Sequence, residues 1–187
     1  MMNKKYQLLR HDTMVRDGRT LYRIQAVRQV RLGVQKGALG GYVEREANLS
    51  HEGECWIFQE ACVYEEARLT ENACLYDQAT LRGKAKLGKQ AMLREQAIVQ
   101  GEANVGGYAT VQGHVIVDGS AEVKGKVNLI DFVHVGENAR VQGDSLYYLL
   151  LQGTSILIGN TLIQGYGVFP DEEAILEAGS FWVEEDE

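Results

Sequence analysis

Aliphatic residues recur at every sixth position through the middle of the chain. From Ile57 to Val141, all fifteen positions of this series are Ile, Leu or Val. The series consists of Ile57, Val63, Leu69, Leu75, Leu81, Leu87, Leu93, Val99, Val105, Val111, Val117, Val123, Leu129, Val135 and Val141. Four places after each comes a small residue, in most cases alanine, and the last of these small positions is Ser145. Short strands joined by tight corners keep a period of six, whereas a helix or a free strand does not, so the pattern predicts a parallel β-helix.

Alternation along each short strand predicts which side chains fill the coil. The small residue of a hexad and the aliphatic residue two places later point inward, and a polar or glycine pair such as Gly101-Glu102 turns the corner. Glycine at the first corner position, as from Gly101 to Gly125, is expected where the backbone adopts a positive φ. Three hexads make one triangular turn, so fifteen hexads predict five turns and a prism roughly 24 Å tall.

The repeat resembles the hexapeptide of left-handed β-helix proteins, as in Val99-Gln100-Gly101-Glu102-Ala103-Asn104. The segment before it, with Leu39-Gly40-Gly41-Tyr42-Val43, Asn48-Leu49-Ser50 and Gly53-Glu54-Cys55-Trp56-Ile57, is similar to the start of YdcK-type hexapeptide-repeat proteins. Those are proteins of enterobacteria and prophages that are acetyltransferase-like by fold. The resemblance covers about residues 20 to 145 and implies left-handed coiling, an exception to the usual handedness of parallel crossovers.

We therefore predict an all-β fold, a single-stranded left-handed parallel β-helix with caps at both ends. Residues 1–40 are expected to form a basic, β-rich N-terminal cap, residues 41–146 the hexapeptide-repeat β-helix, and residues 147–187 an apolar and acidic C-terminal cap or oligomerisation segment. In the N-terminal cap, Asp17-Gly18 between two alternating runs predicts a β-hairpin. After Ser145 the repeat stops, and we expect a hairpin over residues 155–163 and a short helix over residues 171–179.

The net charge of −7 conceals an asymmetry. Residues 1–36 carry nine Lys or Arg against two Asp, which gives +7, so the remaining residues carry −14. A basic segment can bind nucleic acid or another polyanion. The alternative, that it lies against the acidic body of its own chain or of a neighbour, is preferred here, and nucleic-acid binding is not expected.

The apolar segments and the cysteines of the sequence bear on where in the cell the protein is located. The sequence has no apolar run long enough to span a membrane, and the N-terminus lacks the apolar stretch of a signal peptide, so no membrane association is expected. Three cysteines without a Cys-x-x-Cys pair favour a reducing compartment over a disulfide framework. We therefore expect a cytoplasmic protein.

Candidate catalytic residues come from the histidines of the repeat. Hexapeptide acyltransferases, which resemble this chain in their coil, use a histidine base at a cleft between subunits. His114 at a corner and His134 on an outward position could lie near Asp118 and Asp131, and an imidazole beside a carboxylate can act as a general base. In the same family a loop projects from the coil and shapes the acceptor pocket. The fifteen hexads of this sequence, by contrast, contain no insertion. An acyltransferase with acetyl-CoA as cofactor is therefore the alternative function, not the first.

Metal chemistry is not predicted. The γ-carbonic anhydrases, which share this coil, need three convergent histidines, and only two lie in the repeat. The cysteines are scattered, with Cys55 at an inward position and Cys62 and Cys74 outward on different faces. We expect neither a metal nor a resident cofactor.

Outward apolar residues point instead to association. Alternation with the inward column places large side chains on one face and on the face beside it, where a monomer would not keep them in water. These predicted interface residues are Trp56, Phe58, Tyr76, Met92, Ile98, Ile116 and Ile130. The sequence thus favours a non-catalytic binding or assembly protein, a homo-oligomer with a trimer favoured over a dimer, that also binds a protein partner and that a prophage could encode.

Overall fold

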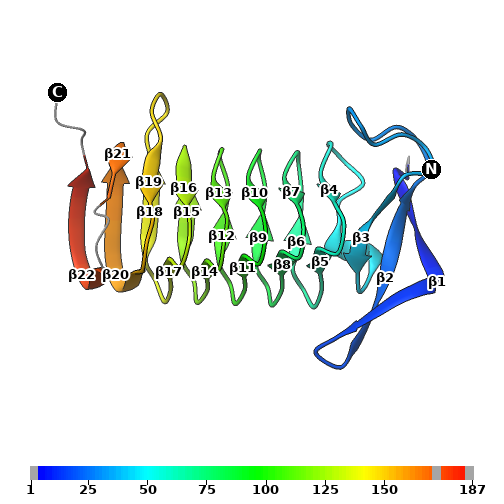
Figure 1. The fold of residues 1–187 in the computed structure, drawn as a ribbon, viewed down its shortest axis with the longest axis horizontal. Helices are drawn as coiled ribbons and strands as arrows, with labels where there is room; N and C mark the ends of the chain where they lie inside the picture. The colour runs from blue at the N-terminus through cyan, green and yellow to red at the C-terminus, as the bar shows by residue number, and fades with distance from the viewer. Residues whose placement is uncertain (1–3, 170–173, 184–187) are drawn as a thin grey trace.

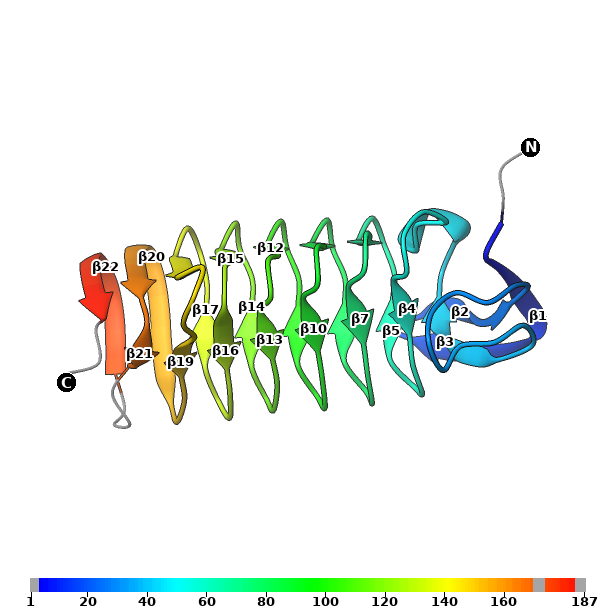
Figure 2. The same cartoon turned by 90° about the horizontal axis from the view of Figure 1, so that it is seen from above.

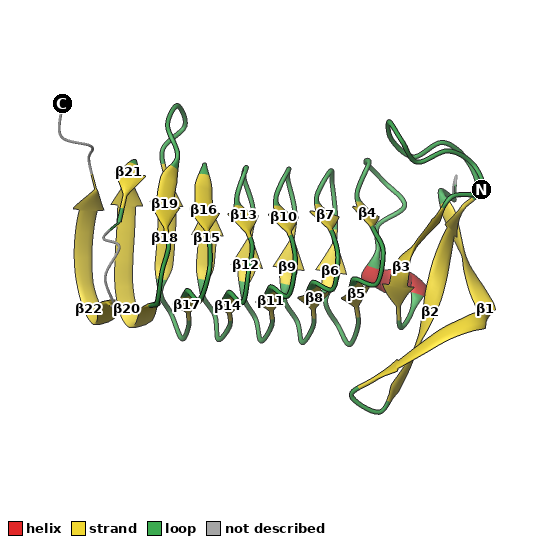
Figure 3. Ribbon diagram, in the orientation of Figure 1, coloured by secondary structure: helices red, strands yellow, loops and turns green. Residues whose placement is uncertain are grey.

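The computed structural model describes residues 4–169 and 174–183 and shows a parallel β-solenoid of about eight turns, more than the repeat predicts. Its coils stack in a straight column between an N-terminal hairpin and a C-terminal strand (Figures 1 and 2). The one helical segment of the described chain is the three-residue 3-10 turn η1 (Glu46–Asn48), drawn red in Figure 3, so no helix of those residues could cross a membrane.

Short parallel strands form three faces. The first face contains β4 (Trp56–Ile57), β7 (Cys74–Leu75), β10 (Met92–Leu93), β13 (Thr110–Val111), β16 (Val127–Leu129), β19 (Leu149–Leu151) and β21 (Gly167–Val168). The second face contains β3 (Leu39–Val43), β5 (Cys62–Val63), β8 (Thr80–Leu81), β11 (Ile98–Val99), β14 (Ile116–Val117) and β17 (His134–Val135). The third contains β6 (Arg68–Leu69), β9 (Lys86–Leu87), β12 (Asn104–Val105), β15 (Glu122–Lys124) and β18 (Arg140–Gly143), while β20 (Ser155–Gly165) pairs with both β17 and β18.

The core matches the predicted inward columns. Each of the fifteen aliphatic residues is at most 1% exposed, and the small residues from Ala61 to Ala139 are fully buried beside them. Strand partners are three hexads apart along the chain, as in Met92 with Thr110. At Ser145 the prediction is wrong, because this residue is exposed in a loop that leaves the coil.

The corners use the left-handed backbone conformation at their first position. Gly101 and Gly119 have φ of 67° and 59°, as the glycine pattern predicts. In other coils the same position holds a non-glycine residue, and Asp77 and Glu95 adopt φ of 60° and 59°. A short polar side chain such as that of Asp77 tolerates this conformation because it can form local hydrogen bonds there.

The N-terminal residues form the predicted hairpin. Strands β1 (Tyr6–Arg16) and β2 (Arg19–Ala26) pair antiparallel around Asp17-Gly18, where φ is 50° and 73°. Strand β2 pairs antiparallel with β3, and β3 pairs parallel with β5, so the hairpin extends the second face beyond the first coil. In this position it covers the N-terminal end of the solenoid.

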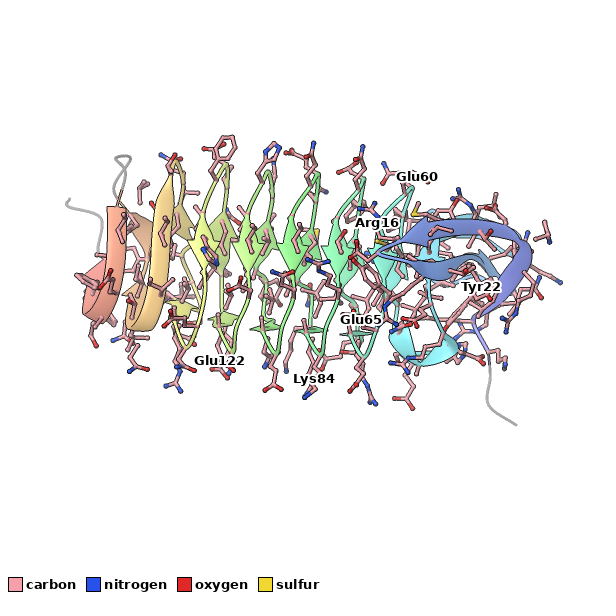
Figure 4. The ribbon with its side chains drawn as sticks, turned by 90° about the horizontal axis from the view of Figure 1, so that it is seen from below. Arg16, Tyr22, Glu60, Glu65, Lys84 and Glu122 are labelled. Atoms are coloured by element: carbon pink, nitrogen blue, oxygen red, sulfur yellow. The ribbon has the colours of Figure 1, made fainter. Side chains whose placement is uncertain are left out.

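The hairpin also folds back over the side of the coil. The Tyr64 hydroxyl donates to Asp17 at 2.7 Å, and Arg82 donates to the same carboxylate at 2.5 Å. Figure 4 shows Arg16, at the tip of the hairpin, lying over the coils, with Tyr22 farther back. Under the hairpin, Cys62 and Tyr64 are buried against Leu21.

The basic N-terminal segment lies against its own acidic body, as preferred from the sequence. Arg23 binds Asp12 at 2.8 Å and Glu60 at 3.0 Å. Two further cations of the segment form ion pairs with the coil entry, Lys4 with Glu46 and Arg19 with Glu44.

The C-terminal part continues the solenoid, which corrects two predictions. Residues 155–163 are not a hairpin, because β20 is one strand that bends at Gly159, with φ of 66°, and passes from the second face to the third. The expected helix over 171–179 is also wrong where it is described, since β22 (Ala174–Val183) pairs parallel with β20; residues 171–173 lie outside the described residues.

Candidate functional site

The predicted catalytic residues do not form one constellation. His134 Nε2 lies 3.1 Å from Asp118 Oδ1, with both side chains about one-third exposed on the second face. His114, by contrast, stacks on Phe132 at a corner, with ring centroids 5.0 Å apart. Asp131 accepts a hydrogen bond from the Gly153 N–H at 3.3 Å. The structure therefore joins one pair, His134 and Asp118, and gives the other two residues separate partners.

Gly136 makes room for the His134–Asp118 pair. A Cβ at this glycine would lie 2.8 Å from Asp118 Oδ1 and 2.9 Å from His134 Nε2. The imidazole and the carboxylate thus lie close to the backbone at Gly136, two residues after His134 in the same coil. A side chain at this position would displace one of the two groups.

The cysteines and acids form no metal site within the described residues. No group of three or more His, Cys, Asp or Glu side chains converges there. Cys55, Cys62 and Cys74 are free and all buried; the last two have the outward positions predicted for them, but other segments of the chain cover them. Cys62 lies under the hairpin, and Cys74 contacts the Arg31 guanidinium.

The ammonium group of Lys5 is buried next to Cys55. Its ammonium donates to the Cys55 carbonyl at 2.9 Å and lies 3.0 Å from the Cys55 thiol, with the Glu52 and Gly53 carbonyls at 3.4 Å. Burial lowers the pKa of Lys5 and raises the pKa of the Cys55 thiol. This lysine ties the start of β1 to the irregular loop before β4.

The predicted interface residues divide into two groups. Trp56 is fully buried, so its expected exposure is wrong. The loop of residues 27–37 reaches this part of the face, because its Arg31 contacts Cys74, the strand partner of Trp56, and its Val30 and Val34 belong to the same core cluster. Phe58 and Tyr76 stack on each other with centroids 4.6 Å apart and are partly buried. Met92, Ile98, Ile116 and Ile130 are likewise partly exposed on outward positions.

An apolar ladder lies on the second face beyond the hairpin. Ile98 pairs with Ile116, Ile116 with His134, and His134 with Ile156, so their side chains stack outward in register. All four are partly exposed. We refer to Ile98, Ile116 and Ile156 as the isoleucine ladder. It begins one coil beyond Arg82, the last coil residue that the hairpin tip contacts through Asp17.

A loop of residues 144–148 leaves the coil between β18 and β19. Val111 and Leu129 are paired at the usual separation of three hexads, whereas Leu129 pairs with Leu151, so four extra residues are inserted. The loop rises above the other corners on the same edge (Figure 1) and exposes 71% of Leu146 and 48% of Tyr148. Lys126 Nζ donates to the Leu146 carbonyl at 2.8 Å and holds the loop against the coil.

This loop is an insertion in the coil, so the prediction that the repeat has none is wrong at its last hexad. The sequence contains the signal, because the six-residue spacing resumes after a shift of four positions, at Leu151, Leu157, Ile163 and Phe169. All four residues are buried. The shift moves the register beyond Val141, so a search at a fixed period places Ser145 inside and misses the later coils.

A groove runs along the same edge. It has a volume of about 320 Å³ and extends from Arg31 in the 27–37 loop to Tyr148 in the inserted loop. Asn72, Gln90 and Tyr108 line its length from corners of successive coils. Neither repeat histidine lines this groove.

No protein-family model matches the sequence, and no curated protein matches it. The resemblance to YdcK-type proteins therefore depends on the repeat and the entry segment alone.

Proposed function

We propose that this protein is a non-catalytic binding and assembly module, a rigid solenoid that self-associates side by side and binds a protein partner. We also infer that it is a left-handed hexapeptide-repeat protein of the YdcK type. The observation that carries the functional proposal is the isoleucine ladder. Its side chains stack in register on a flat sheet face, next to a part of that face that the chain already covers with its own hairpin.

The covered part of the second face supports association through the rest. There the outward side chains of Cys62 and Tyr64 are buried against Leu21 of the hairpin. Beyond the hairpin tip the face continues with Ile98 and Ile116, which remain partly exposed. A β-branched side chain has few rotamers to lose, and an aliphatic one is worth about 1.5–3 kcal/mol when fully buried, so a ladder of isoleucines favours a dry contact.

The ladder alone is too small for a stable interface, which buries about 1,200 Å² or more. Ile130 extends the apolar surface around the adjoining corner, four residues before His134. Side-by-side packing of two or three solenoids would bring such surfaces together along several coils. We favour a trimer over a dimer, because hexapeptide-repeat proteins that this chain resembles assemble in this way.

Light scattering coupled to size exclusion tests the proposal. The wild type should run at a multiple of 20.8 kDa, and the double variant Ile98→Glu, Ile116→Glu should run as the 20.8 kDa monomer. A matched pair of charges on the third face, Thr70→Glu with Asn104→Glu, should leave the wild-type mass unchanged. A wild type that is monomeric at micromolar concentration contradicts self-association.

The acyltransferase alternative is favoured by one observation, the contact between His134 and Asp118. It lies within the isoleucine ladder, between Ile116 and Ile156, where a subunit boundary would place it beside a second chain. Acetyl-CoA would be the acyl donor. Calorimetric titration with acetyl-CoA separates the two functions, since micromolar binding supports the enzyme and no heat of binding supports the assembly module.

A further inference from the structure

The groove at the corner between the third and first faces has two raised ends. In Figure 1 the 27–37 loop and the loop between β18 and β19 stand above the short corners that lie between them. Arg31 belongs to one raised end and Tyr148 to the other, and both line the groove. Five coil spacings, about 24 Å in total, separate the coil of Glu54 from that of Tyr148. A ligand in this groove is therefore elongated and lies parallel to the solenoid axis.

Two half-exposed tyrosines occupy this edge. Tyr108 is 49% exposed and Tyr148 is 48% exposed. One coil, that of Lys126, lies between the two coils to which they belong, so these coils are about 10 Å apart along the axis. Gln90 Nε2 donates to the Tyr108 hydroxyl at 3.2 Å, and Lys126 Nζ lies 5.7 Å from the centre of the Tyr148 ring. Neighbouring side chains thus hold both rings in place.

The backbone of the groove wall has no groups to offer an added peptide strand. The N–H groups of Asn72, Gln90 and Tyr108 donate to carbonyls of the next coil at 2.9–3.0 Å. A peptide recognised by strand addition needs a free edge of such groups. Recognition along this groove has to come from side chains.

The cations at and beside the groove, Arg31 and Lys126, are also engaged. The Arg31 guanidinium contacts the Cys74 thiol and lies 3.5 Å from the Glu54 carbonyl, and Lys126 donates to the Leu146 carbonyl. Such a groove has no row of free cations for a chain of phosphates. The groups that remain for a ligand are side-chain amides, the Glu54 carboxylate, a phenol hydroxyl, the Met92 side chain and the two aromatic rings.

We propose that this groove binds a neutral, linear oligosaccharide. Sugar rings have hydroxyl groups at their edges, which match the amides of Asn72 and Gln90, and C–H groups on their faces, which pack on aromatic rings. Tyr108 and Tyr148 serve as two such stacking positions on successive parts of one glycan chain. The rigid coil fixes their spacing before the ligand binds, which reduces the entropy lost on binding. The groove is separate from the isoleucine ladder, which lies on the second face.

Affinity electrophoresis tests this site with defined probes. Native gels would contain a soluble neutral polysaccharide, in turn hydroxyethyl cellulose, xyloglucan, mixed-linkage β-glucan, galactomannan and glycogen. The wild type should be retarded in at least one of them, and calorimetry with a hexasaccharide of that polysaccharide then gives the affinity. Tyr108→Ala and Tyr148→Ala should each weaken binding by about fivefold to tenfold, the value of one aromatic contact.

The matched control is Phe132→Ala, which removes an exposed aromatic ring from a different corner, where it stacks on His114. It should bind like the wild type. If a tyrosine variant fails to fold, as judged by its thermal unfolding, Asn72→Ala and Gln90→Ala replace it with the same expected direction. A wild type that no polysaccharide retards, or tyrosine variants that bind as tightly as the wild type, would overturn the proposal.

Discussion

The carboxylate of Asp77 accepts a hydrogen bond from the backbone N–H of Glu95, one coil later, at 3.0 Å. The Asp77 N–H in turn donates to the side-chain oxygen of Gln59, one coil earlier, at 2.8 Å. All three residues occupy the same corner and have φ between 50° and 60°. A polar side chain at a left-handed corner therefore links successive coils, which a glycine at that position cannot do.

This link predicts different costs for two substitutions at Asp77. Asp77→Ala keeps the left-handed strain that Asp77 already carries and loses a hydrogen bond, so it should cost about 1 kcal/mol. Asp77→Gly loses the same bond but relieves about 1 kcal/mol of strain, so the two effects nearly cancel and the change should cost little. Urea unfolding measures both, with Gln78→Ala at the exposed neighbouring position as a neutral control. Equal losses for Ala and Gly would show that the corner strain is negligible.

Lys5 should contribute far more to stability than its neighbour Lys4. Lys5→Met leaves the buried Cys55 carbonyl without its ammonium donor, and we expect a loss of about 2 kcal/mol or more. The side chain of Lys4 is 58% exposed in its ion pair with Glu46, so Lys4→Met should lower the free energy of unfolding by less than about 1 kcal/mol. Chemical unfolding of the two variants side by side decides this, and equal effects would contradict the role given to Lys5.

Tyr64 predicts a loss of stability at high pH. Burial, together with the hydrogen bond to Asp17, raises the pKa of Tyr64 from about 10 to about 12. The folded state therefore keeps a proton that the unfolded chain releases, and this contribution to stability is lost as the pH rises from about 10 through about 12. The difference in unfolding free energy between the wild type and Tyr64→Phe should shrink over that range.

Asp17→Asn is the companion variant, because it removes the charge next to the phenol. Asp17→Asn should lower the pKa of Tyr64 in the folded protein. The pH range over which stability is lost should therefore end at a lower pH than in the wild type. If the wild type and Tyr64→Phe lose stability in parallel above about pH 10, the hairpin does not bury this hydroxyl.

The two repeat histidines are expected to be dispensable for folding. His114 and His134 are both on the surface and have separate partners, Phe132 and Asp118. The double change to Ala should cost no more than about 1 kcal/mol in thermal unfolding. If an acyl transfer activity fell about a hundredfold or more in this variant, which is the effect of a lost general base, the acyltransferase function would be supported instead.

The repeat made the coil predictable because its signal depends on neighbours within one hexad. Val99 and Ala97 point inward for the same local reason in the sequence and in the structure. The hairpin at Asp17-Gly18 was predictable in the same way, from its turn residues. By contrast, Thr161-Leu162-Ile163 alternates like a strand of a hairpin and gives no sign that it pairs in parallel with Arg140-Val141 of the preceding coil.

The surfaces were less predictable because they depend on contacts between distant segments. Trp56 has the outward position that the repeat assigns to it, yet it is buried in one core cluster with Val30 and Val34 of the 27–37 loop, and no periodicity relates the two segments. The groove was missed for a similar reason. It needs Arg31 and Tyr148, which are far apart in the sequence and meet only through the stacking of coils.

The contact of Asp17 with Arg82 also constrains the order of events during synthesis. The hairpin leaves the ribosome first, but the surface that receives its tip exists only after the chain has been made through Arg82 and wound into coils. The base of the hairpin can pair with β3 early, but its tip must wait undocked while about 65 further residues emerge. The cap is therefore completed only after the first coils beneath the tip have formed.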